Sequence, residues 1–195
     1  MSTPIHILLG FPVKTLEELS EGRGRGRDGA FLTPRLMTLL REGLERRGFH
    51  VIGVEVLALR PEGWSAQRKQ YRTKALLDMA REKAKALPDW HTKVLLITDA
   101  DIYAPETLFV AGHAEVDGRA AIVSFARLGA GDELRFVMRV LKETLHELGH
   151  TIGLGHCRDH GCVMFASRVL ADSDVKAMDF CERCRTKAGR ALKVE

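Results

Sequence analysis

The chain has 195 residues, of which 45% are hydrophobic and 29% charged, so it can build a packed core and wholesale disorder is excluded. Lysine and arginine exceed the acids by 30 to 26, and this net charge of +4 is too small to indicate a nucleic-acid partner. No apolar run approaches the ~18–20 residues that cross a bilayer, and no signal peptide is recognisable. We therefore expect a single-domain cytoplasmic protein without a membrane partner.

Strand patterns alternate with helical ones over the first 130 residues. Short apolar runs predict strands at residues 5–9, 51–59, 93–98, 109–115 and 120–125. The run 93–98 is apolar on both faces, which is typical of a central strand. Asp117-Gly118 predicts a hairpin between the last two runs. The fold class is therefore predicted as α+β, with a mixed twisted sheet of four to five strands.

Helical periodicity predicts helices over residues 34–47, 65–87 and 131–152, and a last helix from about residue 172 to 192. Ser65 is the expected N-cap of the second helix. In the third, the residues expected to face the core are Leu134, Met138, Leu141, Leu145 and Leu148.

One segment, residues 21–29, alternates glycine with arginine and cannot build a core. It is either a basic flap near a substrate or a solvated loop, and the solvated loop is the favoured interpretation.

The third predicted helix carries the motif His146-Glu147-Leu148-Gly149-His150. Residues one helical turn apart share a face, so His146 and His150 can present two imidazoles to one ion. Gly153 permits a left-handed turn that ends the helix, and the chain can then bring His156 to the same ion. An accidental match to three histidines, a glutamate and a glycine at this spacing has a probability on the order of 10⁻⁴.

Three neutral imidazoles leave one zinc position open for water, which is typical of a catalytic rather than a structural site. Glu147 stands beside the first ligand and is placed to act as general base and later as proton donor to the leaving amine. The alternative is a histidine-rich helix end whose imidazoles are satisfied in the core.

All four cysteines lie in the last 39 residues, as Cys157, Cys162, Cys181 and Cys184. The spacings C-x4-C and C-x2-C suit a closed tetrahedral zinc site with four thiolates. Two redox pairs or buried apolar thiols are the alternatives. His160 lies between two of the cysteines and could compete as a ligand, although an exposed loop histidine is the favoured interpretation.

Taken together, the runs 146–157, 162–164 and 181–184 resemble the archaemetzincins, a metzincin-clan family of zinc metallopeptidases. The resemblance implies a metzincin-like fold and two zinc ions per chain, one catalytic at the three histidines and one structural at the four cysteines. It also implies Glu147 as general base and Met164 as the residue of the Met-turn beneath the catalytic zinc.

The resemblance further implies one catalytic domain over residues 1–195. Its lobe 1–153 contains the active-site helix, and its lobe 154–195 contains the Met-turn and the cysteine site. One spacing departs from the family pattern, since 16 residues separate Met164 from Cys181 where the pattern has one more.

Peptide substrate is expected to add to an edge strand within residues 109–125, by the same resemblance. His113 lies in this region and is expected to be an ordinary exposed histidine. Whether the protein trims amino termini or cuts internally is open, because an aminopeptidase needs a carboxylate for the substrate's amino group. The candidates that follow the central strand are Asp99, Asp101 and Glu106.

The leading hypothesis is a zinc-dependent peptidase that acts on peptides or proteins, and a monomer is favoured. A zinc-stabilised peptide-binding protein with little turnover is the alternative, although such a protein has no chemical use for Glu147. A nucleic-acid module is a third hypothesis, based on the cysteines and the basic C-terminus (Arg183, Arg185, Lys187, Arg190 and Lys193), but these charges lack aromatic partners.

Overall fold

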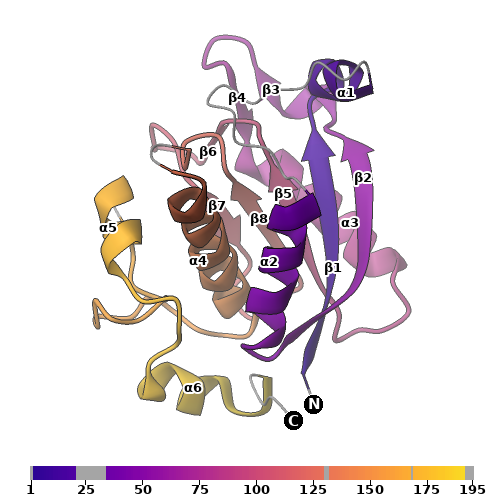
Figure 1. Cartoon of the computed structure of the whole chain (residues 1–195). Helices are drawn as coiled ribbons and strands as arrows, with labels where there is room; N and C mark the ends of the chain where they lie inside the picture. The colour runs from indigo at the N-terminus through magenta and orange to yellow at the C-terminus, as the bar shows by residue number, and fades with distance from the viewer. Residues whose placement is uncertain (1, 21–33, 130–131, 168, 192–195) are drawn as a thin grey trace.

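Figure 1 shows the computed structural model, which describes residues 2–20, 34–129, 132–167 and 169–191. The glycine- and arginine-rich segment 21–29 lies outside the described residues. The strands are β1 (Thr3–Phe11), β2 (Phe49–Ala58), β3 (Trp64–Ser65), β4 (Gln70–Arg72), β5 (Lys93–Thr98), β6 (Ile102–Tyr103), β7 (Gly112–Ala114) and β8 (Ala120–Ser124). The helices are α1 (Val13–Ser20), α2 (Pro34–Glu45), α3 (Thr73–Ala86), α4 (Glu133–Thr151), α5 (Leu170–Val175) and α6 (Glu182–Ala188), with 3-10 turns at Pro61–Gly63 and Gly189–Ala191.

The main sheet has five strands in the order β2-β1-β5-β8-β7. The first four are parallel, and β7 pairs antiparallel with β8 across the hairpin that contains Asp117. This arrangement confirms the predicted mixed sheet and hairpin. It also places β7 at one edge of the sheet, and residue 109 to Ala111 lie outside the strand that was predicted to begin there.

Helices cover both faces of this sheet, because β5 is apolar on both sides as predicted (Figure 1). Leu95 and Ile97 pack in one core cluster with α2 and α4, whereas Val94 and Leu96 pack in a second cluster with α3. Helices α2 and α4 approach closely at Gly43, where an added Cβ would lie 2.4 Å from the Leu141 side chain.

The predicted start of the second helix at Ser65 is wrong. Ser65 pairs with Gln70 in a short antiparallel ribbon, and Tyr71 then pairs with Ile102 in a small sheet of order β3-β4-β6. Helix α3 consequently begins only at Thr73. Local periodicity could not show this pairing, because the partner strand lies about thirty residues further along the chain.

The predicted last helix, 172–192, is also wrong, because the chain forms α5 and α6 separated by the irregular segment 176–181. Two tertiary contacts explain the break. The Lys176 side chain is fully buried, and Asp179 O accepts a hydrogen bond of 2.9 Å from Val163 N.

The apolar stripe predicted for α4 is partly wrong. Leu141, Leu145 and Leu148 are buried, but Leu134 is 67% exposed and Met138 is 37% exposed. The first turns of α4 instead bury Phe136, Val137 and Val140. Within the described residues, none of the helices is long and apolar enough to cross a bilayer.

Candidate metal centre

Helix α4 carries the HExxH motif in its last two turns. Asp132 caps the other end, where its carboxylate accepts a hydrogen bond of 2.8 Å from Arg135 N. His146, Glu147 and His150 are all buried between the sheet and the C-terminal segment. The motif is therefore presented by a rigid, packed helix rather than by a loop.

Two backbone carbonyls orient the first two imidazoles. His146 Nδ1 lies 2.9 Å from Val163 O, and His150 Nδ1 lies 2.7 Å from Leu154 O. A carbonyl can only accept, so each neutral ring donates from Nδ1 and leaves its Nε2 lone pair free for a metal. The two Nε2 atoms are 3.2 Å apart, close to the roughly 3.3 Å expected for two nitrogens on one tetrahedral zinc ion.

A tight turn ends α4 and brings the third histidine round. Gly153 has a φ of 87°, its N–H donates to His150 O, and Leu154 N donates to Gly149 O, which together form a Schellman cap. As a result, three ring nitrogens lie within 4.8 Å of one another, one each from His146, His150 and His156. His156 is exposed, so the predicted ligand set has one open side.

The end of α4 is also held by the hairpin of the sheet. Asp117 N donates to His150 O at 2.9 Å, and Lys93 Nζ donates to both Thr151 O (3.0 Å) and Gly118 O (2.7 Å). A cation at this end of a helix is favoured by the helix dipole. Sequence reasoning missed Lys93, because nothing local marks it as a cap for a helix 58 residues away.

Burial keeps the histidines neutral. It lowers the pKa of His146 to about 4, with the positive charge of Lys176 acting in the same direction. The pKa of His150 is also lowered, chiefly by burial. Neutral imidazoles are the form that binds a metal ion, so this donor set fits zinc.

Glu147 is 6% exposed and packs against Gly112 at the start of β7. Burial, and then the negative charge of Glu143, raise its pKa well above the ordinary value of a glutamate. Within the described part of the chain, no donor hydrogen-bonds its carboxylate. A buried carboxylate whose pKa is raised is a better proton acceptor than an ordinary surface glutamate.

Met164 lies beneath the helix turn that carries the histidines. An added Cβ at Gly149 would lie 2.3 Å from Met164 Sδ, so the bare glycine lets the thioether sulfur rest against the helix backbone. The backbone of Met164 is held by the segment that follows α4, since Cys157 N donates to Met164 O at 2.8 Å. The role of Met164 in a Met-turn stays a prediction of the resemblance.

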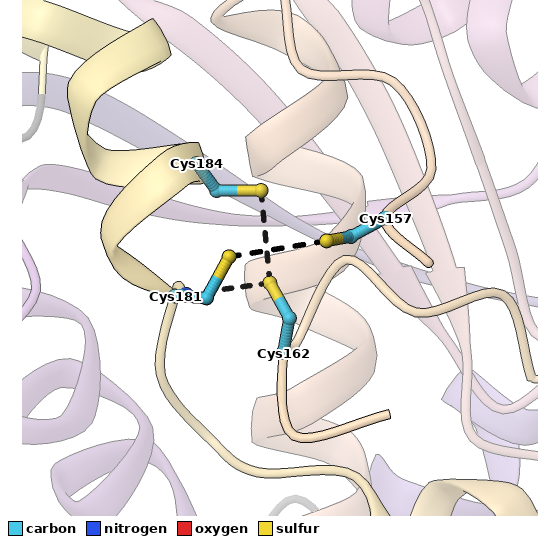
Figure 2. A group of neighbouring side chains, drawn as sticks. All are labelled: Cys157, Cys162, Cys181 and Cys184. Atoms are coloured by element: carbon cyan, nitrogen blue, oxygen red, sulfur yellow. Dashed lines mark hydrogen bonds between the residues drawn. The ribbon is translucent and has the colours of Figure 1, made fainter. Parts of the chain in front are cut away.

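The four cysteines converge from two segments (Figure 2), because Cys157 and Cys162 follow α4 whereas Cys181 and Cys184 begin α6. The Sγ atoms of Cys157 and Cys181 are 3.8 Å apart, and those of Cys162 and Cys184 are 3.7 Å apart. Sulfurs on one tetrahedral zinc ion lie about 3.8 Å apart, so the cluster fits a closed structural site.

Protonation of these thiols depends on their surroundings. Burial raises the pKa of Cys162 and of Cys184, whereas a hydrogen bond from the Cys184 amide lowers the pKa of Cys181. Zinc binding would release the remaining thiol protons. His160 does not belong to this group, and its ring stacks on Phe165 with centroids 4.1 Å apart.

A buried ion pair lies one turn before the first histidine, and sequence reasoning missed it. Lys176 Nζ is 3.0 Å from Glu143 Oε1, and Ser173 Oγ donates to the same carboxylate at 2.8 Å. Burial alone would raise the pKa of Glu143, but the Lys176 charge holds it below the ordinary value. Glu143 faces α5, so α4 is charged rather than apolar on this side.

The remaining sequence candidates lie elsewhere. Asp101 accepts two hydrogen bonds from Arg127, of 2.8 and 2.6 Å, and Asp99 accepts one from Thr15. His113 is half-buried rather than exposed, because its Nδ1 is 3.2 Å from Thr73 Oγ1. None of these residues joins a metal-binding group within the part of the chain that the structure describes, and neither does the exposed Glu106.

Comparison with known proteins identifies the family. The model of peptidase family M54 matches residues 54–190. The archaemetzincin of Methanopyrus kandleri is 45% identical over 130 residues, which cover 67% of this chain and 72% of that protein. The archaemetzincin of Archaeoglobus fulgidus is 40% identical over 125 residues, which cover 64% of this chain and 72% of that protein.

Solved structures of archaemetzincins and of a related peptidase also match this chain. The crystal structure of the M. kandleri archaemetzincin gives a TM-score of 0.76 at 33% identity and covers 97% of this chain and 96% of that chain. The structure of a zinc-dependent peptidase from Methanocorpusculum labreanum gives 0.68 at 27% identity and covers 95% of this chain and 100% of that chain. These matches confirm both the resemblance and the predicted fold class. The chain therefore belongs to peptidase family M54, the archaemetzincins.

Proposed function

We propose that this protein is a zinc-dependent peptidase in which His146, His150 and His156 hold the catalytic metal and Glu147 is the general base. The observation that carries the proposal is the convergence of three imidazole nitrogens within 4.8 Å beside a buried carboxylate that lacks a hydrogen-bond donor among the described residues. When bound there, zinc would supply a Lewis acid that polarises the scissile carbonyl and lowers the pKa of water.

Besides the metal, a peptidase needs a surface that binds the peptide and a group that transfers the proton, and the chain's own residues can supply both. Strand β7 lies at the edge of the main sheet, and its outer side pairs with no other described strand. An extended peptide can add to this edge through backbone hydrogen bonds, which would bring it alongside Glu147. Glu147 would take a proton from the attacking water and pass it to the leaving amine.

A second zinc ion at the four cysteines is part of the proposal, and its role is structural. We also place the protein in the cytoplasm, because free thiols at metal-site spacing persist in a reducing compartment. Metal analysis should give two zinc equivalents per chain. Cys181→Ser should lower the count by one without removing the metal at the histidines.

The aminopeptidase version of the proposal gains no support from Asp101, since Arg127 already neutralises it. N-acetylation of peptide substrates separates the two versions. An aminopeptidase loses activity on acetylated peptides, whereas an enzyme that cuts internally does not.

Glu147→Gln tests the proposal directly, because glutamine keeps the shape of the side chain but cannot accept the proton. We expect cleavage of a mixed peptide library to fall by about 10²–10⁴-fold with both zinc ions retained. Glu42→Gln, a surface change on α2, is the matched control and should cleave like the wild type. Equal cleavage by the wild type and Glu147→Gln would refute the peptidase mechanism, and binding without cleavage would support the peptide-binding alternative.

A further inference from the structure

Gly112 is the first residue of β7 and faces Glu147. A Cβ built on Gly112 would lie 2.4 Å from Glu147 Oε1, 2.6 Å from its Cγ and 2.7 Å from its Cδ. Real Cβ atoms essentially never approach another heavy atom within 3.0 Å. The Glu147 side chain therefore occupies the volume that any other residue at position 112 would fill.

The strand side of this contact is held in place. Ser124 N donates to Ala111 O at 2.7 Å, and Gly112 pairs with Val123 of β8. On the other face of the strand, His113 is hydrogen-bonded to Thr73 of α3. A methyl group at position 112 would consequently displace the carboxylate more readily than the strand.

We propose that Gly112 is a positioning residue for the peptidase reaction: its missing side chain creates the space in which the Glu147 carboxylate stands beside the edge strand. This inference rests on the proposed function of Glu147. To restore an ordinary contact of 3.4 Å, an alanine at this position must push Oε1 away by about 1 Å. A misplacement of that size in a reacting group costs on the order of 10²-fold in rate.

The kinetic test uses Gly112→Ala in the zinc-loaded protein. We expect kcat to fall by about 10- to 100-fold while KM changes by less than about two-fold and both zinc ions remain. Gly53→Ala is the matched control, because Gly53 lies in β2 at the opposite edge of the sheet and its Cβ would crowd His6 Nδ1 at 2.7 Å. That variant is strained too, but its kcat should match the wild type.

A thermal test needs no activity. Gly112→Ala should lower Tm by about 5 °C in the wild-type background, because it overpacks a buried contact. In a Glu147→Ala background the same change should lower Tm by less than about 1 °C, since the crowding side chain is gone. Gly53→Ala should lower Tm equally in both backgrounds.

The outcomes separate this inference from the proposed function. A wild-type kcat for Gly112→Ala, or the same loss of Tm in both backgrounds, would overturn the role of Gly112 while Glu147→Gln remains inactive. Full activity of Glu147→Gln would overturn the proposed function and, with it, the positioning role. If Gly112→Ala alone fails to fold, recovery of a folded double variant with Glu147→Ala still supports the steric contact, and failure of both contradicts it.

Discussion

Two imidazoles of the candidate site are oriented by carbonyl groups from different parts of the chain. Val163 O, next to Met164, receives the Nδ1 proton of His146, and Leu154 O receives that of His150. Each hydrogen bond fixes the ring and its tautomer before any metal arrives. Burial adds to this preorganisation, because it disfavours the protonated form that cannot bind zinc.

Metal-free protein should lose stability in acid because of His146. Its pKa is about 4 in the folded state against 6.5 for an unperturbed histidine, so between these pH values the unfolded chain binds a proton that the folded chain does not. The free energy of unfolding should therefore fall by about 3 kcal/mol from pH 6.5 to pH 4, and this contribution should stop changing below pH 4. Urea unfolding in the presence of a chelator measures it.

His146→Gln is the control for this effect, because it removes the titrating group but keeps a polar side chain. Its unfolding free energy should fall less steeply than that of the wild type between pH 6.5 and 4. An equal fall of the unfolding free energy with pH in the two proteins would contradict the lowered pKa of His146.

At the level of secondary structure, α5 docks on α4 through charges rather than through an apolar seam. Arg139 binds the Asp174 carboxylate with two hydrogen bonds of 2.7 Å, and Lys142 Nζ donates to the carbonyls of Ser173 and Asp174. The residue after Lys142, Glu143, accepts a hydrogen bond from Ser173 and forms an ion pair with Lys176. These contacts fix α5 against the helix turn that precedes His146.

Loss of one member of the buried ion pair should be costly. Lys176→Met leaves the Glu143 carboxylate buried without its ammonium partner, and we expect the free energy of unfolding to fall by about 3–5 kcal/mol. Urea denaturation of the zinc-loaded protein measures this loss. The double variant with Glu143→Leu should recover most of it, because no unpaired charge then remains.

Lys187→Met serves as the matched control, since Lys187 is exposed on α6 and its loss should change stability by less than about 0.5 kcal/mol. A loss for Lys176→Met no larger than that of the control would show that the pair contributes little.

For the molecule as a whole, the segment after α4, which was predicted to form a C-terminal lobe over residues 154–195, places α5 beside α4 and α6 at the end of the molecule where the two termini lie (Figure 1). Arg47 at the end of α2 donates to Met178 O and forms an ion pair with Asp179, and the rings of Phe49 and Phe180 lie 6.4 Å apart. The helices of this segment are short, and its buried apolar residues, among them Val163, Met164 and Phe180, join the main core cluster instead of forming one of their own. A zinc ion at the four cysteines, as proposed, would cross-link the two halves of this segment.

Removal of the metal from the cysteine site should loosen this lobe selectively. In Cys181→Ser, or after exhaustive chelation, we expect amide hydrogen exchange to accelerate over residues 157–188 and to stay slow in β1, β5 and β8. Hydrogen-exchange mass spectrometry with peptide resolution measures both regions in one experiment. Unchanged protection over residues 157–188 would show that the lobe does not depend on the cysteine site.

The sequence was most informative where local pattern and packing agree. The run of β5 is apolar on both faces because two helical layers cover it, and the spacing of His146, His150 and His156 follows directly from helix and turn geometry. The start of α3 could not be predicted, since Tyr71 pairs with a strand about thirty residues away. Helix α1 was not predicted either.

Tertiary charge pairs account for the other failures. The break between α5 and α6 follows from the burial of Lys176 beside Glu143, a pairing that no local spacing reveals. Helical periodicity predicted that Met138 faces the core, yet its neighbour Arg139 is buried instead, where it binds Asp174 of α5. The contact between Gly112 and Glu147 could not be predicted for a different reason, because a glycine in a short strand does not indicate which side chain packs against it.

The turn after α4 has a consequence for how the chain can vary. The same few residues supply the carbonyl that orients His150 and carry the backbone round to His156. Insertion or deletion of a single residue there would move both imidazoles relative to His146. The length of this turn is therefore constrained, because it sets the positions of both imidazoles.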